Sequence, residues 1–300
     1  MAVIDRENVL KGLTVQEAMR RVVISIHQAS PIEQAIRFTI KYKANALLVT
    51  NESREGTGVV SKTDLMGAYY AGLPLETPVE AIMVGPPAFC QQLDSLESTL
   101  ETMRSERVHR LYVWDGEPLR AVGVLAYPDI VGLLYRYCHK CRKSILRPRS
   151  TDSEVALSER FRVREVMTDS VHSNQEDENL LQVMESLSTY RLGAVLINDK
   201  DGVPVGVVSK TDLMIAYKHG VPAEIPSKSI MNSPVRACDD NDFLAVAVQN
   251  MIFSDIHRSF VYRGDPTNII GVLSLSDAAR VRSGSCRACM TSRIEVAKDS

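Results

Sequence analysis

The stretch GVVSKTDLM occurs twice in the chain, at residues 58–66 and again at residues 206–214. The two occurrences lie 148 positions apart, and the same step carries Asp129 onto Asp277 without any gap. A repeat that keeps a fixed step over most of a sequence indicates one structural unit that has been duplicated. The sequence therefore predicts two related halves that share a fold.

Each half contains a second, weaker repeat. Asp64 and Asp129 lie 65 positions apart, and the same number separates Asp212 from Asp277. The segments that end at Asp129 and Asp277 read GVLAYPD and GVLSLSD, which are weaker counterparts of GVVSKTD. We therefore expect four copies of one unit in two pairs, and we number the copies one to four along the chain.

The hydrophobic pattern within a copy predicts its secondary structure. Residues 30–42 and 178–190 carry apolar residues at the i, i+3, i+4 and i+7 spacing of an amphipathic helix. Residues 45–50 and 193–198 are short apolar strands, GVVS is a further strand, and KTDLMGAYYAG is a helix that stops at a glycine. With a short strand at the start, the order is β-α-β-β-α. One copy cannot bury both helices and both sheet faces, so pairing is expected.

Four βαββα copies, each closing with a Gly-apolar-apolar-Ser-x-x-Asp element (Ala for Ser in copy two), resemble cystathionine-β-synthase (CBS) domains. Two such copies resemble a Bateman module, and the resemblance covers about residues 13–138 and 161–286. It implies an α/β (α+β) fold in which four CBS motifs form two pseudo-symmetric pairs. The expected division is motif 1 at residues 1–76, motif 2 at 77–138, a linker at 139–160, motif 3 at 161–224, motif 4 at 225–290 and a C-terminal tail at 291–300.

The resemblance also implies that an adenosine-type ligand, of the AMP, ADP, ATP or S-adenosylmethionine class, binds in clefts between paired motifs. In the family the aspartate holds the ribose hydroxyls, and the serine or threonine three residues earlier faces phosphate. A carboxylate can accept hydrogen bonds from both hydroxyls of a diol, and a helix N-terminus attracts an anion. The expected ligand-binding residues are Ser25, Ser61, Lys62, Thr63, Asp64, Asp129, Ser173, Ser209, Lys210, Thr211, Asp212, Ser274, Ser276 and Asp277.

The Ser-x-x-Asp element has a second interpretation that needs no ligand. Ser61 can be the N-cap and Asp64 the N3 residue of a capping box, a device worth about 1 kcal/mol. The two interpretations overlap, because a preorganised helix start is also what a phosphate requires. Copy two differs, since Ala126 has no hydroxyl and Pro128 removes one N–H from the first turn. We therefore predict that a nucleotide occupies the clefts of copies one and three before that of copy two.

A further alignment places Ser25, Cys90, Ser173 and Cys238 at the same point of the first short strand in the four copies. In CBS domains this strand borders the ligand cleft, so these side chains are candidate ligand contacts. A small, half-buried residue without a binding role fits the same position.

All six cysteines fall in two triplets that are related by the step of 148. Four of them form two C-x-x-C pairs, namely Cys138, Cys141, Cys286 and Cys289. These pairs could supply four thiolates to one tetrahedral Zn²⁺ if the halves pack with pseudo-twofold symmetry. They could instead act as dithiol switches, or they could be inert small residues at a helix end. All three interpretations stay open.

Composition places the chain among ordinary globular proteins. Its 300 residues are 45% hydrophobic and 24% charged, with a formal net charge of −2. This balance provides no positive field for nucleic acid and no polybasic membrane patch. The N-terminus lacks the pattern of a signal peptide, and no apolar run approaches the roughly 20 residues of a membrane span. We therefore expect a soluble, cytoplasmic protein.

The sequence contains no nucleophile elbow, P-loop, zincin motif or Rossmann fingerprint, so we predict a protein that is not an enzyme. The His-Arg dipeptides at residues 109–110 and 257–258 are assigned a structural or surface role. The leading hypothesis is a regulatory sensor that requires no cofactor, binds an adenosine-type ligand and signals to an unknown protein partner. A homodimer and a single disc made of the two halves are both compatible with it. The alternative is a structural scaffold linked by Zn²⁺ or by thiols.

Overall fold

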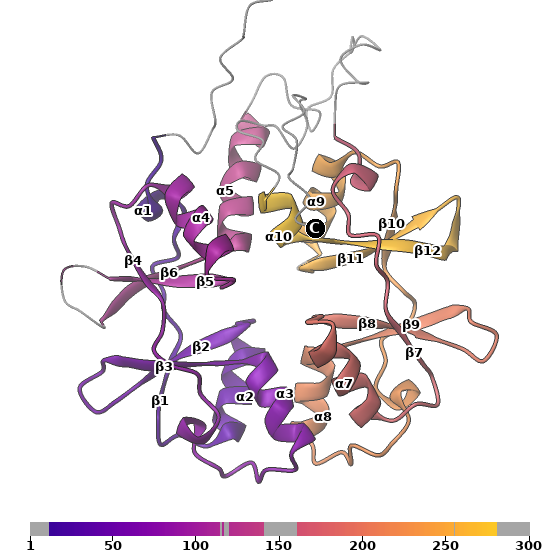
Figure 1. Cartoon of the computed structure of the whole chain (residues 1–300), viewed down its shortest axis with the longest axis horizontal. Coiled ribbons are helices and arrows are strands. Elements are labelled where there is room, and N and C mark those ends of the chain that lie inside the picture. The colour runs from indigo at the N-terminus through magenta and orange to yellow at the C-terminus, as the bar shows by residue number, and fades with distance from the viewer. Residues whose placement is uncertain (1–11, 115, 117–119, 141–160, 255, 281–300) are drawn as a thin grey trace, which may run out of the picture.

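The computed structural model describes residues 12–114, 116, 120–140, 161–254 and 256–280. Within these residues the chain forms four three-stranded sheets, each accompanied by helices, and the four units are arranged in a ring (Figure 1). This arrangement confirms the predicted α/β fold, in which four copies of one unit form two pairs.

The first half of the chain contains copies one and two. The short helix α1 (Val15–Ala18) comes first. Copy one then comprises β1 (Ser25–His27), α2 (Ile32–Lys41), β2 (Ala46–Thr50), β3 (Gly56–Ser61) and α3 (Lys62–Tyr70). Copy two comprises the 3-10 helix η1 (Val79–Ala81), β4 (Phe89–Gln91), α4 (Leu96–Ser105), β5 (Arg110–Trp114), β6 (Ala121–Ala126) and α5 (Tyr127–Lys140).

The second half repeats this order in copies three and four. Copy three comprises the 3-10 helix η2 (Val163–Glu165), β7 (Ser173–Gln175), α7 (Leu180–Thr189), β8 (Ala194–Asn198), β9 (Pro204–Ser209) and α8 (Lys210–Lys218). Copy four comprises the 3-10 helix η3 (Ser227–Ser229), β10 (Ala237–Asp239), α9 (Leu244–Phe253), β11 (Arg258–Arg263), β12 (Asp265–Ser274) and α10 (Leu275–Arg280). The predicted β-α-β-β-α order is therefore confirmed in all four copies.

The observed helices follow from the hydrophobic pattern. The buried residues of α2 include Ile32, Ile36 and Thr39, which lie on one face of the helix. Helix α3 is followed by Gly72, whose φ of 66° lies in the left-handed region that favours glycine. The helix therefore ends where the sequence predicts. Among the residues that the structure describes, none of the helices has both the length and the apolar character needed to cross a bilayer.

In each sheet the first strand is parallel to the second, and the third strand is antiparallel to the second. The register shows that the alignment of Ser25 with Cys90 is wrong. Ser25 of β1 lies opposite Leu48, and the residue at the same point of copy two is Phe89, which lies opposite Tyr112. Cys90 is one position further along its strand.

The cause of this offset is one extra residue in a hairpin turn. Matched residues of copies one and two lie 64 positions apart before the turn between β5 and β6, and 65 positions apart after it. The same offset separates Cys238 from Ser173 in the second half. Because a shift of one residue moves a side chain to the other face of a sheet, Cys90 is buried whereas Ser25 and Ser173 are exposed.

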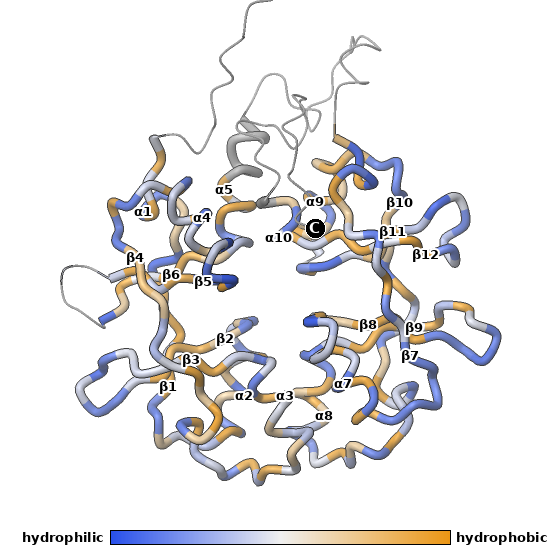
Figure 2. Tube along the Cα trace, in the orientation of Figure 1, coloured by the Kyte–Doolittle hydropathy of each residue, from blue (hydrophilic) through white to orange (hydrophobic). Residues whose placement is uncertain are grey.

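The two main hydrophobic cores join copies across the halves. One core combines buried residues of copies one and three, such as Leu65 and Leu213. The other combines copies two and four, with Leu125 and Leu273 among its members. Within the first half, the sheets of copies one and two meet through a smaller cluster around Tyr112. Helix α3 therefore packs on α8 and α5 on α10, which closes the ring, while hydrophilic residues predominate in the outer hairpins (Figures 1 and 2).

The glycine that begins each GV element is required by close packing. A Cβ on Gly58 would lie 2.7 Å from Sδ of Met83, and a Cβ on Gly123 would lie 2.8 Å from Sδ of Met19. The segment after Met83 bridges to β3 of copy one, and the segment after Met19 bridges to β6 of copy two. The chain that enters one copy therefore packs on the other copy, which ties each pair together.

Candidate ligand site

The repeated Ser-Lys-Thr-Asp segments form complete capping boxes at the starts of α3 and α8. The backbone N–H and the hydroxyl of Ser61 each donate to Asp64 Oδ2 at 2.7 Å, and Asp64 N donates to Ser61 Oγ at 3.4 Å. Ser209 and Asp212 repeat these bonds at 2.7, 2.6 and 3.4 Å. The capping interpretation is therefore confirmed for copies one and three.

The same two segments contact each other across the interface between the halves. Lys62 Nζ donates to Thr211 Oγ1 at 2.8 Å, and Lys210 Nζ donates to Thr63 Oγ1 at 2.7 Å. Each copy therefore supplies a lysine that donates and a threonine that accepts. This reciprocity gives a physical reason for the identity of the two segments, because a change in one copy removes a partner from the other.

Two tyrosines extend this reciprocal interface. The rings of Tyr69 and Tyr217 stack with centroids 4.8 Å apart and planes 11° apart. Tyr69 Oη donates to the carbonyl of Val221, and Tyr217 Oη donates to the carbonyl of Leu73, both at 2.6 Å. Burial raises the pKa of Tyr69 to about 12, so its hydroxyl remains a donor at neutral pH. These contacts stabilise the packing of α3 on α8.

The helix starts of copies two and four differ from each other. In copy two, Ala126 N donates to Asp129 Oδ2 at 2.9 Å, and Arg20 Nε forms an ion pair with Asp129 Oδ1 at 2.8 Å. In copy four, the N–H and hydroxyl of Ser274 donate to Asp277 Oδ2 at 2.9 and 2.5 Å. Copy four therefore has both the backbone and the hydroxyl hydrogen bonds of the capping box, whereas copy two has only the backbone hydrogen bond to the aspartate.

The four aspartates also differ at their second carboxylate oxygen. Oδ1 of Asp129 is engaged by the ion pair just described, and Oδ1 of Asp212 accepts from Asn232 Nδ2 at 2.8 Å. Neither Asp64 nor Asp277 receives a hydrogen bond at Oδ1 from another residue that the structure describes. Copies one and four therefore offer the carboxylate oxygen that is most available to a ligand.

Two arginines lie beside the helix starts of copies two and four. Arg110 at the start of β5 pairs with Ala126, and Arg258 at the start of β11 pairs with Ser274. Arg110 Nη1 donates to the carbonyl of Ala46 at 3.0 Å. Nη1 of Arg258, by contrast, is buried and has no hydrogen-bond partner in the described structure. Burial lowers the pKa of both guanidinium groups, which shows that each charge is held in a poorly solvated place.

Lys210 shares the environment of Arg258. Burial, together with the nearby charge of Arg258, lowers the pKa of the Lys210 ammonium to about 8, while Asp64 acts in the opposite direction. These three residues come from copies three, four and one, and we call them the central cluster. Asp64 interacts with Lys210, and Asp277 interacts with Arg258. Because Nη1 of Arg258 still lacks a hydrogen-bond partner in the described structure, the cluster can accept an anion, for example a phosphate group, by charge-assisted hydrogen bonds.

Sequence reasoning missed Arg20, Arg110 and Arg258 as site residues. His109 and His257 are exposed, in keeping with the surface role assigned to the dipeptides, but the arginines that follow them are largely buried. The hairpin register carried a usable signal, because the first residue of β5 or β11 lies opposite the residue that caps the next helix. No sequence pattern indicated Arg20. It contacts Asp129 because the chain segment that enters copy one packs on β6 of copy two.

Three other predicted residues lie on the first strands of copies one and three and at the helix start of copy four, namely Ser25, Ser173 and Ser276. Ser25 and Ser173 are exposed at the first position of β1 and β7, and Ser173 Oγ accepts from Asn198 Nδ2 at 3.2 Å. Ser276 Oγ lies 2.6 Å from Ser274 Oγ in a hydrogen bond. A contact of these residues with a ligand stays a prediction.

The predicted metal ligands Cys141, Cys286 and Cys289 lie outside the described residues, and of Cys138 only the backbone, within α5, is described. Elsewhere in the described part of the chain, no three His, Cys, Asp or Glu side chains gather as a metal site. The Zn²⁺ and redox interpretations of the C-x-x-C pairs therefore stay predictions. Cys90 is a free thiol, and burial raises its pKa to about 12, so it is uncharged at neutral pH.

Comparison with known families supports the repeat pattern. The model of the CBS domain matches four segments of the chain, residues 15–71, 79–136, 163–219 and 227–284. A crystal structure of a Methanocaldococcus jannaschii protein, described as a candidate archaeal homologue of γ-AMPK, has the same fold. The two structures superpose with a TM-score of 0.74 at 15% sequence identity, covering 89% of this chain and 99% of that one.

Two relatives match only part of the chain. An uncharacterized 33.4 kDa protein in a ribosomal RNA operon of Thermofilum pendens is 22% identical over 189 residues, which are 63% of this chain and 59% of that protein. The γ subunit of the 5′-AMP-activated protein kinase of Saccharomyces cerevisiae is 28% identical over 121 residues, or 37% of each chain. The match therefore spans less than two thirds of the length of either relative.

Proposed function

Because the chain belongs to the CBS domain family, we propose that it is a non-catalytic regulatory protein that binds an adenosine-type ligand of the AMP, ADP, ATP or S-adenosylmethionine class. The observation that carries the proposal is the central cluster of Asp64, Lys210 and Arg258. A buried guanidinium nitrogen without a hydrogen-bond partner lies near an ammonium whose pKa is lowered. A phosphate group would supply the acceptor that this nitrogen lacks, through a charge-assisted hydrogen bond. AMP, ADP or ATP fits this cluster better than a ligand without phosphate.

The ribose would be held by the aspartates at the helix starts. The capping box engages Oδ2 of Asp64 and of Asp277, which leaves Oδ1 of each to accept a ribose hydroxyl. Asp129 is a weaker candidate, because a ligand would first have to displace Arg20 from its carboxylate. The proposed order of occupation therefore places copy two last, as the sequence predicts, and it favours copies one and four over copy three, where Asn232 already donates to Oδ1 of Asp212.

Signalling follows from the origin of the cluster in three different copies. A ligand that contacts Asp64, Lys210 and Arg258 would bind more tightly to the arrangement in which these groups converge. Such differential binding shifts the balance between arrangements of the halves, and a partner protein could read the shift. A relative of this chain is a subunit of a kinase, which supports a role within a larger assembly. A cytoplasmic location remains a prediction from the sequence.

Calorimetric titration of the protein with AMP and with adenosine tests this proposal. We expect AMP to bind about ten- to hundredfold more tightly, because hydrogen bonds to charged groups contribute about 1.5–3 kcal/mol. Arg258→Met should remove most of this preference, and Lys200→Met, in an exposed turn, should preserve it. Equal affinities for AMP and adenosine in the wild-type protein would contradict the phosphate role of the cluster.

The alternative scaffold function needs a separate measurement. Thermal melting with AMP and with a metal chelator distinguishes the two, since a ligand that binds the native state raises its stability by mass action. Stabilisation by AMP with no effect of the chelator supports the sensor. Destabilisation by the chelator, together with zinc in elemental analysis, supports the scaffold.

A further inference from the structure

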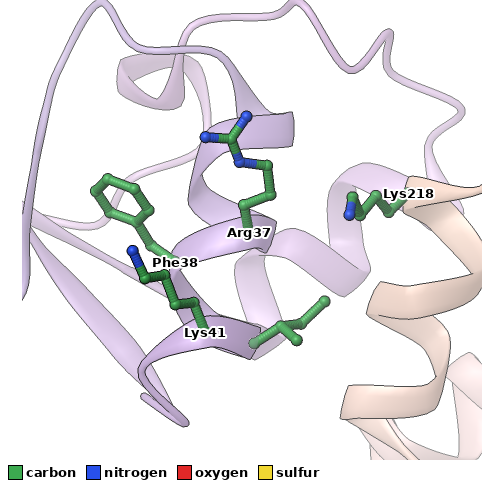
Figure 3. A pocket seen from close by; sticks show the side chains of 5 residues that line it. Arg37, Phe38, Lys41 and Lys218 are labelled. Atoms are coloured by element: carbon green, nitrogen blue, oxygen red, sulfur yellow. The ribbon is translucent and has the colours of Figure 1, made fainter.

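A second candidate site lies away from the central cluster, on the outer surface where α2 meets the end of α8. A pocket of about 260 Å³ is lined by Arg37, Phe38, Ile40, Lys41 and Lys218. The first four belong to α2, and Lys218 faces them from the last turn of α8 (Figure 3). Three cations therefore surround two apolar side chains, and none of the lining residues is acidic.

Ion pairs with the described residues do not neutralise the positive charge of this pocket. Neither Arg37 nor Lys218 forms an ion pair with another residue that the structure describes. The ammonium of Lys41 lies 5.1 Å from the centroid of the Tyr42 ring, a contact that leaves its charge in place. Arg37 and Lys41 are also exposed. The pocket therefore presents a localised positive charge to an incoming molecule.

The duplicated fold provides a matched comparison for this pocket. The step of 148 places Glu185 of α7 at the position of Arg37, and Lys218 at the position of Tyr70 of α3. At that equivalent edge Tyr70 Oη donates to Glu185 Oε1 at 2.7 Å, so an acidic residue is tied to its neighbour. Thr189 stands where α2 has Lys41. The basic residues therefore occur where α2 meets α8 and not at the equivalent place where α7 meets α3, so they do not follow from the shared fold.

We propose that this basic pocket, lined by Arg37, Phe38, Ile40, Lys41 and Lys218, is a docking site for an acidic segment of a partner protein that inserts one apolar side chain. Charge complementarity selects the acidic segment, because like charges across an interface are strongly disfavoured. Small-molecule pockets usually measure about 300–1,000 Å³, so the smaller volume here suits a single side chain of a larger partner.

The proposed site also deepens the proposed function, because it places the partner on the same helix as the ligand. Helix α8 begins at Lys210, in the central cluster, and ends at Lys218, in the pocket. Nine residues of α-helix span about 13 Å, so the central cluster and the pocket lie at opposite ends of one short helix. Docking itself does not require a nucleotide, but its use as a signal rests on the proposed function.

Fluorescence anisotropy with a labelled five-residue peptide, four glutamates around one leucine, tests the docking site at low ionic strength without nucleotide. We expect the wild-type protein to bind this peptide about tenfold more tightly than a peptide of four lysines around one leucine. Replacing the leucine by glycine should also weaken binding. The double variant Arg37→Glu, Lys218→Glu should lose about tenfold or more in affinity.

A matched control changes the net charge equally at other places. Arg54→Glu combined with Lys200→Glu alters two exposed residues in hairpin turns and should keep the wild-type affinity for the peptide. Absence of saturable binding, or equal loss in both double variants, would overturn the proposal. Binding to vesicles of phosphatidylcholine and phosphatidylserine that depends on the pocket, with no peptide binding, would instead identify a membrane surface and overturn the protein partner.

Titration with AMP separates this proposal from the proposed function. The double variant Arg37→Glu, Lys218→Glu should bind AMP as the wild-type protein does, because neither residue belongs to the central cluster. Arg258→Met should in turn bind the peptide as the wild-type protein does in the absence of nucleotide. Loss of peptide binding alone therefore reports on the pocket, and loss of AMP binding alone reports on the central cluster.

Discussion

Copies one and three differ from copies two and four in where they carry the cation beside the helix start. In copies one and three it is the first residue of the helix, Lys62 or Lys210, and an alanine begins the neighbouring strand. In copies two and four the cation is the first residue of the equivalent strand, Arg110 or Arg258. The cation therefore lies on the helix in copies one and three and on the strand in copies two and four, and in all four copies it is near the helix start. The comparison indicates that local positive charge is maintained, rather than a particular sequence position.

Copies two and four differ from each other in whether the aspartate is already engaged. Arg20 holds Asp129 through an ion pair, whereas Arg258 interacts electrostatically with Asp277 and keeps one buried nitrogen without a hydrogen-bond partner in the described structure. Copy two is thus neutralised within the protein, and copy four is open to an external anion. Four predictions test these differences between the copies. The first three are arranged from the largest expected effect to the smallest, and the fourth is a dependence on pH.

Replacing Arg20 should give the largest effect on stability. Arg20→Gln leaves the carboxylate of Asp129, which is 10% exposed, without its charged partner and should lower the free energy of unfolding by about 1.5–3 kcal/mol at neutral pH. Burial already raises the pKa of Asp129, and loss of Arg20 raises it further. The native carboxyl then keeps its proton to higher pH than the unfolded one. The loss should therefore grow as pH rises from about 4 to about 7.

Urea unfolding at both pH values measures this difference. Arg21→Gln, at the exposed neighbouring residue, is the control and should change the free energy of unfolding by less than about 0.5 kcal/mol. A loss of the same size at both pH values would argue against the ionised Asp129 as its cause.

The aspartates of copies one and two should differ in their effect on ligand affinity. Asp64→Asn should weaken AMP binding about tenfold, close to 1.4 kcal/mol, because Oδ1 of Asp64 is available to a ribose hydroxyl. Asp129→Asn should have little effect, since its carboxylate is engaged by Arg20. Calorimetric titration of both variants decides the order, and equal losses would refute the ranking of the clefts.

Removing a capping box should lower stability, and restoring the one that copy two lacks should raise it by a smaller amount. Ser209→Ala should lower the free energy of unfolding by about 1 kcal/mol, because Asp212 N loses its acceptor. Ala126→Ser supplies the missing hydroxyl in copy two and should raise stability by a smaller amount, up to about 1 kcal/mol. Urea midpoints of both variants provide the test. A destabilised Ala126→Ser would mean that steric fit at this buried position outweighs the cap.

The fourth prediction is a pH dependence of stability that comes from Lys210. Its pKa in the folded protein is about 8, below the ordinary 10.5, so between these values the unfolded chain binds more protons than the native one. The contribution of this residue to stability should therefore rise with pH across that window. Comparing the unfolding of wild-type protein and Lys210→Met at pH 8 and pH 10 isolates it. If the difference between the two proteins does not change with pH, the ammonium is well solvated.

The sequence allowed much of the fold to be predicted because its signals were local or periodic. The step of 148 identified the halves, and apolar spacing identified strands and helices within each copy. The capping boxes followed from a serine and an aspartate three residues apart at a strand-to-helix junction. The alignment of Ser25 with Cys90 failed, because one extra residue in a hairpin turn shifted the register, and an ungapped alignment cannot place such a residue.

The sequence by itself determined the repeated unit, its elements and the chemical groups at each helix start. Only the tertiary structure decided which of those groups meet. Lys62 reaches Thr211, which is 149 positions away, and Arg20 reaches Asp129 in another copy. Charges of Lys210 and Arg258 add up in one poorly solvated place. These outcomes depend on how the halves pack and how much water they exclude, because electrostatic energies depend on distance and solvation, which no local sequence pattern encodes.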